Sequence, residues 1–239
     1  MMKDILLFSG GLDSLIAWYY LDMPQPVYIP LGHRYQKREL EAVQGFNRKL
    51  GMDTIITKEI PLGEFEEEDA NIPFRNAFLV LMASYYGDAI WLALQKGELN
   101  VPDRTKTFTK EMTLLLSLFK PNHALLKVDS PFWDMTKVDM VRWYKEQGLD
   151  INILLSTTSC YKGTNCGVCS ACFRRWVALI LNGIEEKYGT DPWDSVLAVE
   201  YAVKARRGVY DKERCHEIIT ALNTKWAKED WDTLKKIGV

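Results

Sequence analysis

The sequence predicts an α/β fold, in which helices cover both faces of a parallel sheet and a cysteine-rich loop and a helical tail follow. Three observations support this prediction. Buried-strand and helix patterns alternate over roughly the first 150 residues, a glycine-rich turn joins the first strand to the first helix, and four of the five cysteines lie within Cys160–Cys172. Strands that alternate with helices form parallel sheets with right-handed crossovers.

The first three strands come from short apolar runs. Residues 3–8 (KDILLF) are apolar in succession, and 53–60 (DTIITKEI) are rich in β-branched residues, as buried strands are. Gly51 follows an amphipathic pattern and marks the end of a helix. In chain order, we expect a strand over 3–8, a helix over 13–21, a strand over 26–31, a helix over 37–50 and a strand over 53–60.

The later elements continue this alternation up to about residue 150 and then become helical. Thr136 and Asp139 resemble a capping box that opens a helix, and the acidic stretch 63–71 is typical of a solvated loop. The expected helices are 75–87, 107–119, 136–147, 173–187 and the tail 193–237, and the expected strands are 89–94 and 124–128. We therefore expect two domains, residues 1–150 and 151–239.

Composition indicates a globular cytosolic protein. The net charge of the 239 residues is -2, which gives no strong field toward nucleic acid or membrane. No apolar run approaches the roughly 20 residues of a membrane span, and polar residues interrupt the apolar N-terminal segment, so a signal peptide is not expected. We expect a cytoplasmic location, where clustered cysteines bind metal more often than they form disulfides.

The turn Ser9-Gly10-Gly11-Leu12-Asp13-Ser14 lies between a predicted strand and a predicted helix. Its glycines let the backbone approach a ligand, and the first amides of the following helix attract anions, so the turn suits a phosphate. It matches neither a Walker A sequence nor GxGxxG. Asp13 would repel a phosphate unless Mg²⁺ lay between them. The alternative is a structural turn in which Asp13 caps the helix.

The spacing Cys160-x5-Cys166-x2-Cys169-x2-Cys172 places four thiols in one short segment. Zn²⁺ prefers four such ligands in a tetrahedron, and a site of this kind stabilises a loop without an open coordination position. An iron–sulfur cluster also uses closely spaced thiolates, so iron and non-metal roles stay open alongside zinc. Cys215 stands apart and is interpreted as a small apolar residue.

SGGLDS resembles the PP-loop of N-type ATP pyrophosphatases, and TTSCYKGTNCGVCSACFRR (157–175) resembles the zinc segment of the 7-cyano-7-deazaguanine synthases among them. The resemblance covers residues 3–180 and implies an adenine nucleotide alpha hydrolase-like, Rossmann-like fold. The other matching segments are Gly32-His33-Arg34, Ile72-Pro73-Phe74-Arg75-Asn76, Pro102-Asp103, and Asp129-Ser130-Pro131 through Thr136-Lys137-Val138-Asp139. Leu12, Tyr35, residues 92–106 and the tail after about 185 depart from the family pattern.

The resemblance implies a carbon–nitrogen ligase that uses ATP. Such enzymes adenylate 7-carboxy-7-deazaguanine, ammonia displaces AMP to give the amide, and a second ATP drives formation of the nitrile. It implies the cofactors Mg²⁺ and Zn²⁺ beside ATP, free ammonia as the nitrogen source and a homodimer, with no direct nucleic-acid or membrane partner. The ligands of zinc would be Cys160, Cys166, Cys169 and Cys172.

The resemblance also assigns roles to individual residues. The implied catalytic residues are Ser9, Asp13 and Ser14, which hold pyrophosphate and Mg²⁺, and Arg75 and Lys137, which contact phosphate or carboxylate. The implied nucleotide-binding residues are Phe8, Ser9, Gly10, Gly11, Leu12, Asp13, Ser14, Leu15, Arg34, Asp103 and Arg175. We interpret His33, His123 and His216 as ordinary surface or loop histidines.

Two other functions stay open. A related PP-loop ligase could stop at the amide or join a different carboxylate and amine, because residues 92–106 depart from the family. A non-enzymatic, zinc-stapled nucleotide-binding module could dock a partner through Trp193, Trp226 and Trp231 of the tail.

Overall fold

The computed structural model describes residues 3–68, 70–97, 101–120, 126–160, 162–163 and 165–231. The chain forms two compact units. The first unit comprises Met1–Asp134 and Asn152–Thr158, and the second comprises Met135–Ile151 and Ser159–Val239. Because compactness does not test independent folding, the division into domains at residue 150 stays a prediction.

A five-stranded parallel sheet forms the centre of the first unit. The strands are β1 (Asp4–Leu7), β2 (Gln25–Tyr28), β3 (Ile55–Ile56), β4 (Ala89–Trp91) and β5 (Lys127–Asp129). Their spatial order is β3-β2-β1-β4-β5, and every pairing is parallel, with Ile5 opposite both Gln25 and Ile90. The strand order reverses beside β1, which is where open α/β sheets bind ligands. The predicted parallel sheet is confirmed.

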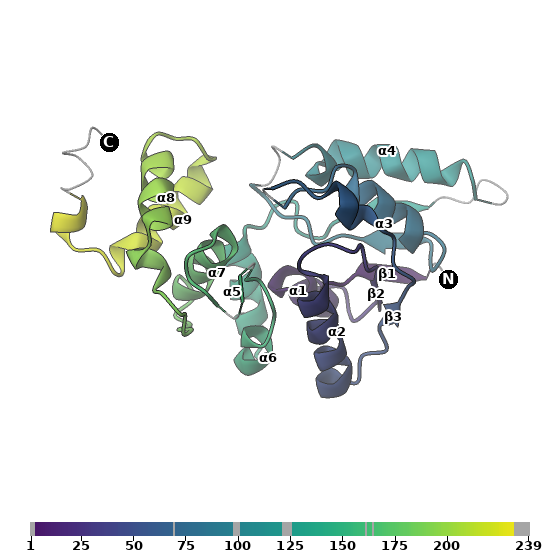
Figure 1. Ribbon diagram of the computed structural model, residues 1–239, viewed down its shortest axis with the longest axis horizontal. Helices are drawn as coiled ribbons and strands as arrows, with labels where there is room; N and C mark the ends of the chain where they lie inside the picture. The colour runs from purple at the N-terminus through teal and green to yellow at the C-terminus, as the bar shows by residue number, and fades with distance from the viewer. Residues whose placement is uncertain are drawn as a thin grey trace. The chain divides into compact units, whose positions relative to one another are not determined.

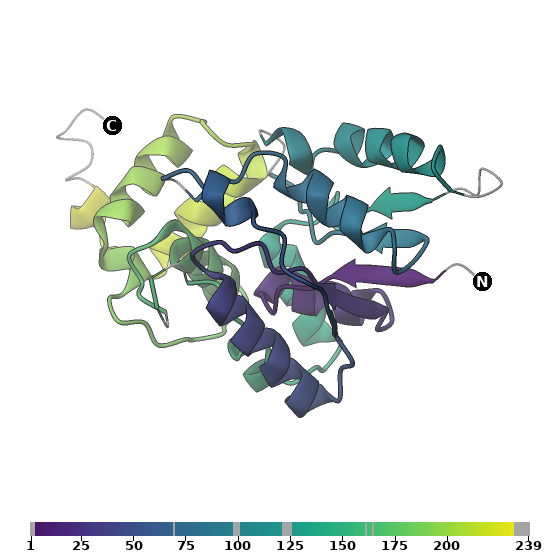
Figure 2. The same ribbon diagram turned by 45° about the vertical axis from the view of Figure 1, so that its right-hand side comes forward.

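Helices cover both faces of this sheet, as predicted. They are α1 (Leu12–Tyr20), α2 (Gln36–Leu50), α3 (Arg75–Ala83) and α4 (Lys106–Ser117), with short 3-10 turns at Leu62–Phe65 and Pro102–Arg104. Figures 1 and 2 show α1 and α2 on one face and α3 and α4 on the other. Ile5, Val27, Ile90 and Val128 are almost fully buried between the layers. Burial on both faces explains why the strand segments are continuously apolar.

The ends of several elements follow from local chemistry. Gly51 ends α2 in the left-handed conformation, at φ 65°, and the Thr105 side chain caps α4 by accepting from the Phe108 amide. Helix α3 ends at Ala83, earlier than the predicted 87, and Lys120 donates to the carbonyls of Ser84 and Gly87 just beyond it. The third strand is only two residues long, and the start of the strand predicted over 124–128 lies outside the described residues.

The second unit is helical in its described residues. It contains α5 (Lys137–Glu146), α7 (Ser170–Ile180), a 3-10 turn at Pro192–Asp194, α8 (Val196–Arg206) and α9 (Lys212–Asn223), while the short α6 (Ile151–Leu155) lies at the division between the units. The capping box of Thr136 and Asp139 is present. The helix predicted over 173–187 is wrong at both ends, because Cys169 caps it earlier and a left-handed Gly183 follows it. Helical structure in the tail is confirmed for α8 and α9; residues 232–237 lie outside the described residues.

Aromatic side chains of the tail pack within the second unit. The rings of Phe173 and Tyr201 stack with centroids 4.4 Å apart, and Trp176 lies 5.5 Å from Trp193. Trp226 donates its indole N–H to the Trp193 carbonyl and meets Trp231 edge to face. These tryptophans therefore help to hold the tail together. No helix in the described part of the chain is long and apolar enough to cross a membrane.

Glu217 links α9 to the start of α5. Its carboxylate accepts from the Thr136 hydroxyl at 2.5 Å, and the same hydroxyl lies 2.9 Å from the Asp139 carboxylate. Burial, opposed by the bond from Thr136 and assisted by Asp139, Glu213 and Asp211, raises the pKa of Glu217 to about 7 from its ordinary 4.5. The folded protein therefore holds this proton more tightly than the unfolded chain does.

We expect Glu217 to make the second unit less stable as pH rises. The stability that the protonated Glu217 contributes is fully present below about pH 4.5. It is lost as the pH rises from there through about 7, because the unfolded chain releases the proton first. Allowing for partial exposure, Glu217→Gln should stabilise the protein by about 1–2 kcal/mol at pH 8 and hardly at pH 5. Thermal unfolding at both pH values measures this. Glu200→Gln on α8 is the control, and an equal effect of Glu217→Gln at both pH values contradicts the prediction.

Candidate nucleotide and metal sites

The glycine turn lies at the carboxyl end of β1, the central strand. Just after β1, the Phe8 amide donates a hydrogen bond to the Val27 carbonyl of β2 at 2.9 Å. Helix α1 then begins at Leu12. Between them Gly10 turns the chain at φ 71°, in the left-handed region that favours glycine. The turn thus delivers the first amides of α1 to the edge of the sheet, where an anion would meet them.

Two neighbouring segments fix the position of this turn. A β-carbon on Gly10 would lie 2.7 Å from the Ala42 β-carbon and 3.1 Å from the Val43 nitrogen of α2, so the backbone and α2 are in close contact. On the other side, the Thr158 amide donates to the Gly10 carbonyl at 3.1 Å, and Gly11 pairs with Thr158 in a parallel bridge. Nothing in the local pattern marks Thr158 as this partner, except that it belongs to the segment that resembles the family.

The side chains of the turn divide into two groups. Phe8, Leu12 and Leu15 are at most 2% exposed, so these three predicted nucleotide-binding residues could offer only backbone atoms to a ligand. Leu12, the unusual residue of the motif, faces the core and leaves the polar surface of the turn unchanged. Ser9 and Asp13 are half-buried, and the buried Ser14 hydroxyl donates to the Gly11 carbonyl at 3.0 Å.

Asp103 binds the start of α3 through Asn76, the residue next to Arg75. The Asn76 amide donates to the Asp103 carboxylate at 3.3 Å, and the Asn76 side chain donates to the Asp103 carbonyl at 3.0 Å. Within the described residues, no hydrogen bond or ion pair engages the half-buried Arg75 guanidinium. Arg75 therefore offers a positive charge at a helix N-terminus, which suits an anion. Asn76 adjoins Arg75 in the motif but was not among the predicted site residues.

Arg34 is tied to the acidic stretch after β3. Its Nε lies 2.8 Å from the Glu66 carboxylate, and its terminal nitrogens donate to the carbonyls of Glu67 and Glu68. A ligand contact at Arg34 would have to share or replace these bonds, so its nucleotide-binding role stays a prediction. His33 lies in the loop between β2 and α2, with a side chain 7% exposed and Nε2 3.4 Å from Glu39. His216 is exposed, and His123 lies outside the described residues.

Lys137 and Arg175 belong to the second unit. Lys137 is the first residue of α5 and is half-buried. Arg175, on α7, is only 1% exposed and forms a two-pronged ion pair with Glu186, in which both N–O distances are 2.8 Å. A phosphate contact at Arg175 would have to break that pair, whereas Lys137 opens a helix where anions are favoured. Both roles remain predictions.

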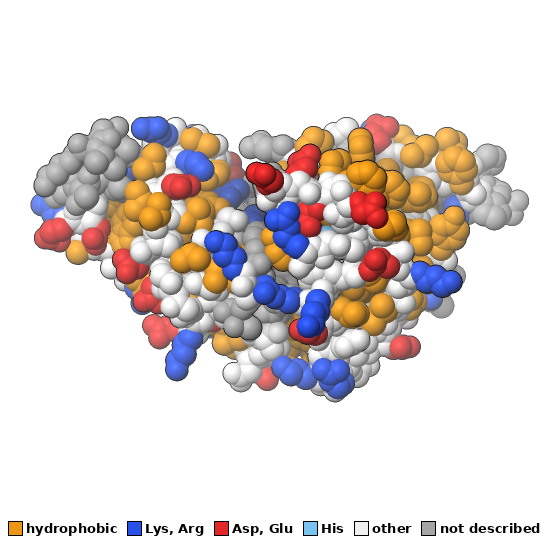
Figure 3. Space-filling view, viewed as in Figure 1, with side chains coloured by type: hydrophobic (Ala, Val, Ile, Leu, Met, Phe, Trp, Pro, Cys, Tyr) orange, Lys and Arg blue, Asp and Glu red, His pale blue; other side chains and the backbone are white. Residues whose placement is uncertain are grey.

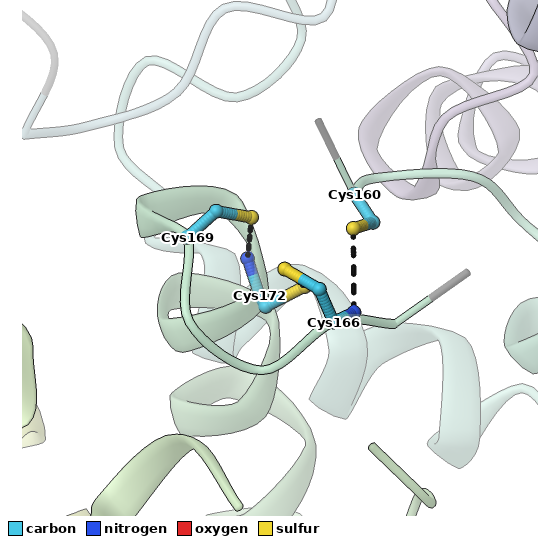
Figure 4. A group of neighbouring side chains, drawn as sticks. All are labelled: Cys160, Cys166, Cys169 and Cys172. Carbon is cyan, nitrogen blue, oxygen red and sulfur yellow. Dashed lines mark hydrogen bonds between the residues drawn. The ribbon is translucent and has the colours of Figure 1, made fainter. Parts of the chain in front are cut away.

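The four predicted metal ligands converge (Figure 4). The sulfurs of Cys160, Cys166, Cys169 and Cys172 all lie within 4.8 Å of one another, and those of Cys166 and Cys172 are 3.9 Å apart. A single tetrahedral ion with bonds of about 2.3 Å requires sulfurs about 3.8 Å apart. The donor set therefore fits one soft metal ion.

Backbone amides and a helix end support negative charge on these sulfurs. The Cys166 amide points at the Cys160 sulfur at 3.3 Å, and the Cys172 amide points at the Cys169 sulfur at 3.4 Å, at the start of α7. A hydrogen bond with Cys169, together with burial, nevertheless raises the pKa of the Cys172 thiol. A bound cation would supply the positive charge that the thiolate form requires.

The cysteine loop is held by its neighbours in the second unit. Gly167 has φ 80°, and a β-carbon there would lie 1.5 Å from the Thr190 carbonyl oxygen, so the two backbones touch. The Thr190 amide also donates to the Cys166 carbonyl at 3.1 Å. Beneath the loop, Tyr188 packs against the cysteines and donates to Glu186, the partner of Arg175. Arg175 is thus linked to the cysteine loop through Glu186 and Tyr188.

A parallel sheet with a glycine turn at its switch point, in one chain with a four-cysteine cluster that could hold a metal ion, is typical of a nucleotide-binding α/β protein with a metal-binding loop. The model of the family described as queuosine biosynthesis protein QueC matches residues 46–183, more than half of the chain. The chain belongs to this family. That assignment confirms the resemblance drawn from the sequence and the prediction of an ATP-dependent enzyme.

Curated relatives extend the similarity beyond the family model. The 7-cyano-7-deazaguanine synthase of Methanocaldococcus jannaschii is 28% identical over 229 residues, which cover 78% of this chain and 98% of the relative. That of Porphyromonas gingivalis is 27% identical, covering 77% and 96%. That of Archaeoglobus fulgidus is 28% identical, covering 86% and 98%. These relatives align over nearly their whole length and leave part of this chain uncovered.

Proposed function

We propose that this chain converts 7-carboxy-7-deazaguanine and ammonia into 7-cyano-7-deazaguanine at the expense of ATP. The observation that supports this most strongly is the SGGLDS turn at the switch point of the sheet, in a chain whose relatives are named for synthesis of that nitrile. The turn accounts for the use of ATP, and the relatives supply the acceptor. We place the reaction in the cytoplasm.

The reaction divides into two activations of the same carbon. A carboxylate oxygen of the substrate attacks the α-phosphorus of ATP, and pyrophosphate leaves. Ammonia then attacks the carboxyl carbon, and AMP leaves with that oxygen, which gives the amide. The amide oxygen attacks the α-phosphorus of a second ATP, and pyrophosphate leaves again. Loss of AMP and of the two protons on nitrogen then gives the nitrile. In both activations the enzyme must hold an oxygen in line with the α-phosphorus.

The glycine turn would bind the departing pyrophosphate. The amides at the start of α1 and the hydroxyls of Ser9 and Ser14 are donors that lie in place before the reaction, so they stabilise charge without reorganising. Ser14 would exchange its bond to the Gly11 carbonyl for one to phosphate. Mg²⁺, held by Asp13, would neutralise the phosphate oxygens. Arg75 and Lys137 would contact phosphate or the substrate carboxylate, and Asp103 would orient the start of α3.

The cysteine cluster would hold structural zinc. Four thiolates leave Zn²⁺ no open position, so the ion contributes folding energy and no reactive water. The close approach of the four sulfurs supports a single ion over an iron–sulfur cluster, in which several irons separate the thiolates. The cysteines are thereby assigned to stability and the glycine turn to chemistry.

Arg75→Ala should lower activity much more than stability. Because its guanidinium engages no described partner, we expect a loss below about 1 kcal/mol in the free energy of unfolding, as for exposed surface changes. Loss of a charge-assisted contact to phosphate or carboxylate should reduce kcat/KM by about 10–100-fold. Steady-state kinetics and thermal unfolding measure the two effects. Arg142→Ala removes the same charge from a surface pair with Asp139 and should change neither; an unchanged kcat/KM for Arg75→Ala would contradict its role.

A ligase that stops at the amide, or that uses another carboxylate, is the second candidate. It is favoured by residues 92–106, which depart from the family pattern. Incubation with ATP, Mg²⁺, ammonium and 7-carboxy-7-deazaguanine, with AMP and product mass followed, separates the two. Formation of AMP together with the nitrile supports the proposal, and accumulation of the amide supports the shorter reaction. If AMP formation does not depend on 7-carboxy-7-deazaguanine, neither reaction with this substrate takes place. The module that docks partners through tail tryptophans is disfavoured, because the Trp226 indole already donates to the Trp193 carbonyl and packs against Trp231.

A further inference from the structure

The residue before Lys137 is held by the helical tail. Thr136, the cap of α5, is 5% exposed, and its hydroxyl donates to the Glu217 carboxylate of α9 at 2.5 Å. Acidic side chains normally stand in water, as those shown in red on the surface in Figure 3 do, because a buried charge loses its hydration. Glu217 is half-buried instead, and its bond to Thr136 offsets part of that loss.

The residue after Lys137 is held by the end of α7. Asn182, just beyond that helix, is 8% exposed, and its side-chain nitrogen donates to the Val138 carbonyl at 3.0 Å and to the Ala178 carbonyl at 2.8 Å. Such buried bonds fix a backbone, because opening one leaves a buried polar group unsatisfied. The lysine side chain therefore starts from a backbone that is held at the residues on both sides of it.

The capping box of α5 does not depend on the tail. The Asp139 carboxylate accepts from the Thr136 amide at 2.9 Å and from the Arg142 guanidinium at 2.7 Å, so it keeps two donors besides the Thr136 hydroxyl. That hydroxyl has a single hydrogen, which is therefore available to Glu217. A protonated Glu217 can instead donate to the same oxygen, so the link between α9 and α5 persists in both forms. Glu217 thus adds a second support to a cap that is already complete.

This second support comes from outside the region that the family model matches. The model ends at residue 183, so it includes the cap of α5 and Asn182 but neither α8 nor α9. The tail of this chain thus reaches back to a segment that resembles the family and carries Lys137.

We propose that Glu217 is a positioning residue for the reaction, which acts on Lys137 through Thr136. The proposal rests on the proposed function, in which Lys137 contacts phosphate or the substrate carboxylate. An ammonium on a flexible stem reaches one fixed point reliably only from a fixed backbone. Both activations need an oxygen held in line with the α-phosphorus, and a misplacement of about 1 Å can lower the rate by about 100-fold. The tail thereby supports the chemistry without touching the substrate.

Amide hydrogen exchange of the full chain tests the support itself, independently of the reaction. In Glu217→Ala the start of α5 should open more readily, so exchange over residues 136–141 should be at least about 10-fold faster. Glu217→Gln keeps an oxygen that accepts from Thr136 and should stay within about twofold of the wild type. Glu200→Ala on α8 removes an exposed carboxylate 4.0 Å from Lys204 and is the matched control, in which exchange over this segment should not change.

Steady-state kinetics test whether the support acts on the lysine. Glu217→Ala should lower kcat by about 10-fold, and Glu217→Gln should recover most of that loss. If Glu217 acts through Lys137, the double variant of Glu217→Ala and Lys137→Ala should be no slower than Lys137→Ala alone. A role in stability alone would move neither the rescue by glutamine nor this lack of additivity.

The possible outcomes separate this inference from the proposed function. If the wild type is active and Glu217→Ala keeps its kcat or its hydrogen exchange, the inference is wrong and the proposed function stands. Losses that add in the double variant also overturn it, because Glu217 then acts elsewhere. If the wild type forms no AMP with 7-carboxy-7-deazaguanine, the proposed function fails and the inference fails with it. Faster exchange together with a non-additive loss supports both.

Discussion

Gly10→Ala is expected to reduce the rate of substrate-dependent AMP formation by at least about 100-fold, the loss typical when a preorganised anion-binding group is displaced. The added β-carbon would lie 2.7 Å from that of Ala42, and the residue would have to keep φ at 71°. A left-handed alanine alone costs about 1–2 kcal/mol. The turn will therefore shift, and the amides of α1 will leave the positions that suit pyrophosphate.

This loss should be one of catalysis more than of folding, since the rest of the β-sheet can keep its packing. Initial rates with saturating ATP measure the loss of catalysis, and thermal unfolding measures the loss of stability. Gly45→Ala on the same helix, α2, is the matched control, because no atom lies within 4 Å of its new β-carbon. Alanine in a helix interior should raise stability by up to about 1 kcal/mol and leave the rate unchanged. Full activity of Gly10→Ala would contradict the assignment of pyrophosphate binding to this turn.

Cys172→Ser should remove the metal and much of the stability of the second unit. The Cys172 side chain is fully buried among the other three ligands, and serine oxygen is a poor fourth ligand for a soft ion. We expect zinc content to fall from about one per chain to well under half, with an unfolding temperature lower by about 10 °C or more. Metal analysis and calorimetry measure these effects.

Cys215→Ser separates this effect from a general sensitivity to the loss of a thiol. Cys215 lies on α9 outside the cluster and donates to the Tyr210 carbonyl at 3.4 Å, a bond that a serine hydroxyl can also make. The metal content and the unfolding temperature of the Cys215→Ser variant should match those of the wild type. If Cys172→Ser kept a full complement of zinc, or if the native protein held iron with visible absorbance, the tetrathiolate zinc assignment would be wrong.

The parts of the fold that local patterns control could be predicted from the sequence. The alternation of apolar strands with amphipathic helices defined the parallel sheet, and the spacing of Cys160–Cys172 predicted their convergence. The glycine turn was predicted because it needs only a strand, a left-handed residue and a helix in succession. Each of these signals lies within a few residues of the chain.

Features that depend on distant partners could not be predicted in this way. Arg34 meets Glu66 across the loops that follow two strands, and Arg175 is buried against Glu186, so neither guanidinium is freely available as the motif alone suggested. Leu12 was an anomaly within the motif until its burial showed that it faces the core. The contact of Thr158 with Gly10 joins residues almost 150 positions apart, and no local pattern encodes it.

Substrate labelled with heavy oxygen in its carboxylate gives the most direct test of the proposed adenylation. Incubated with ATP, Mg²⁺ and ammonium, it should yield AMP in which each molecule carries one heavy oxygen on its phosphate, because both carboxylate oxygens leave with AMP as the nitrile forms. The product nitrile should carry none. AMP that contains only solvent oxygen, or labelled inorganic phosphate formed together with ADP, would contradict adenylation of the substrate by this chain.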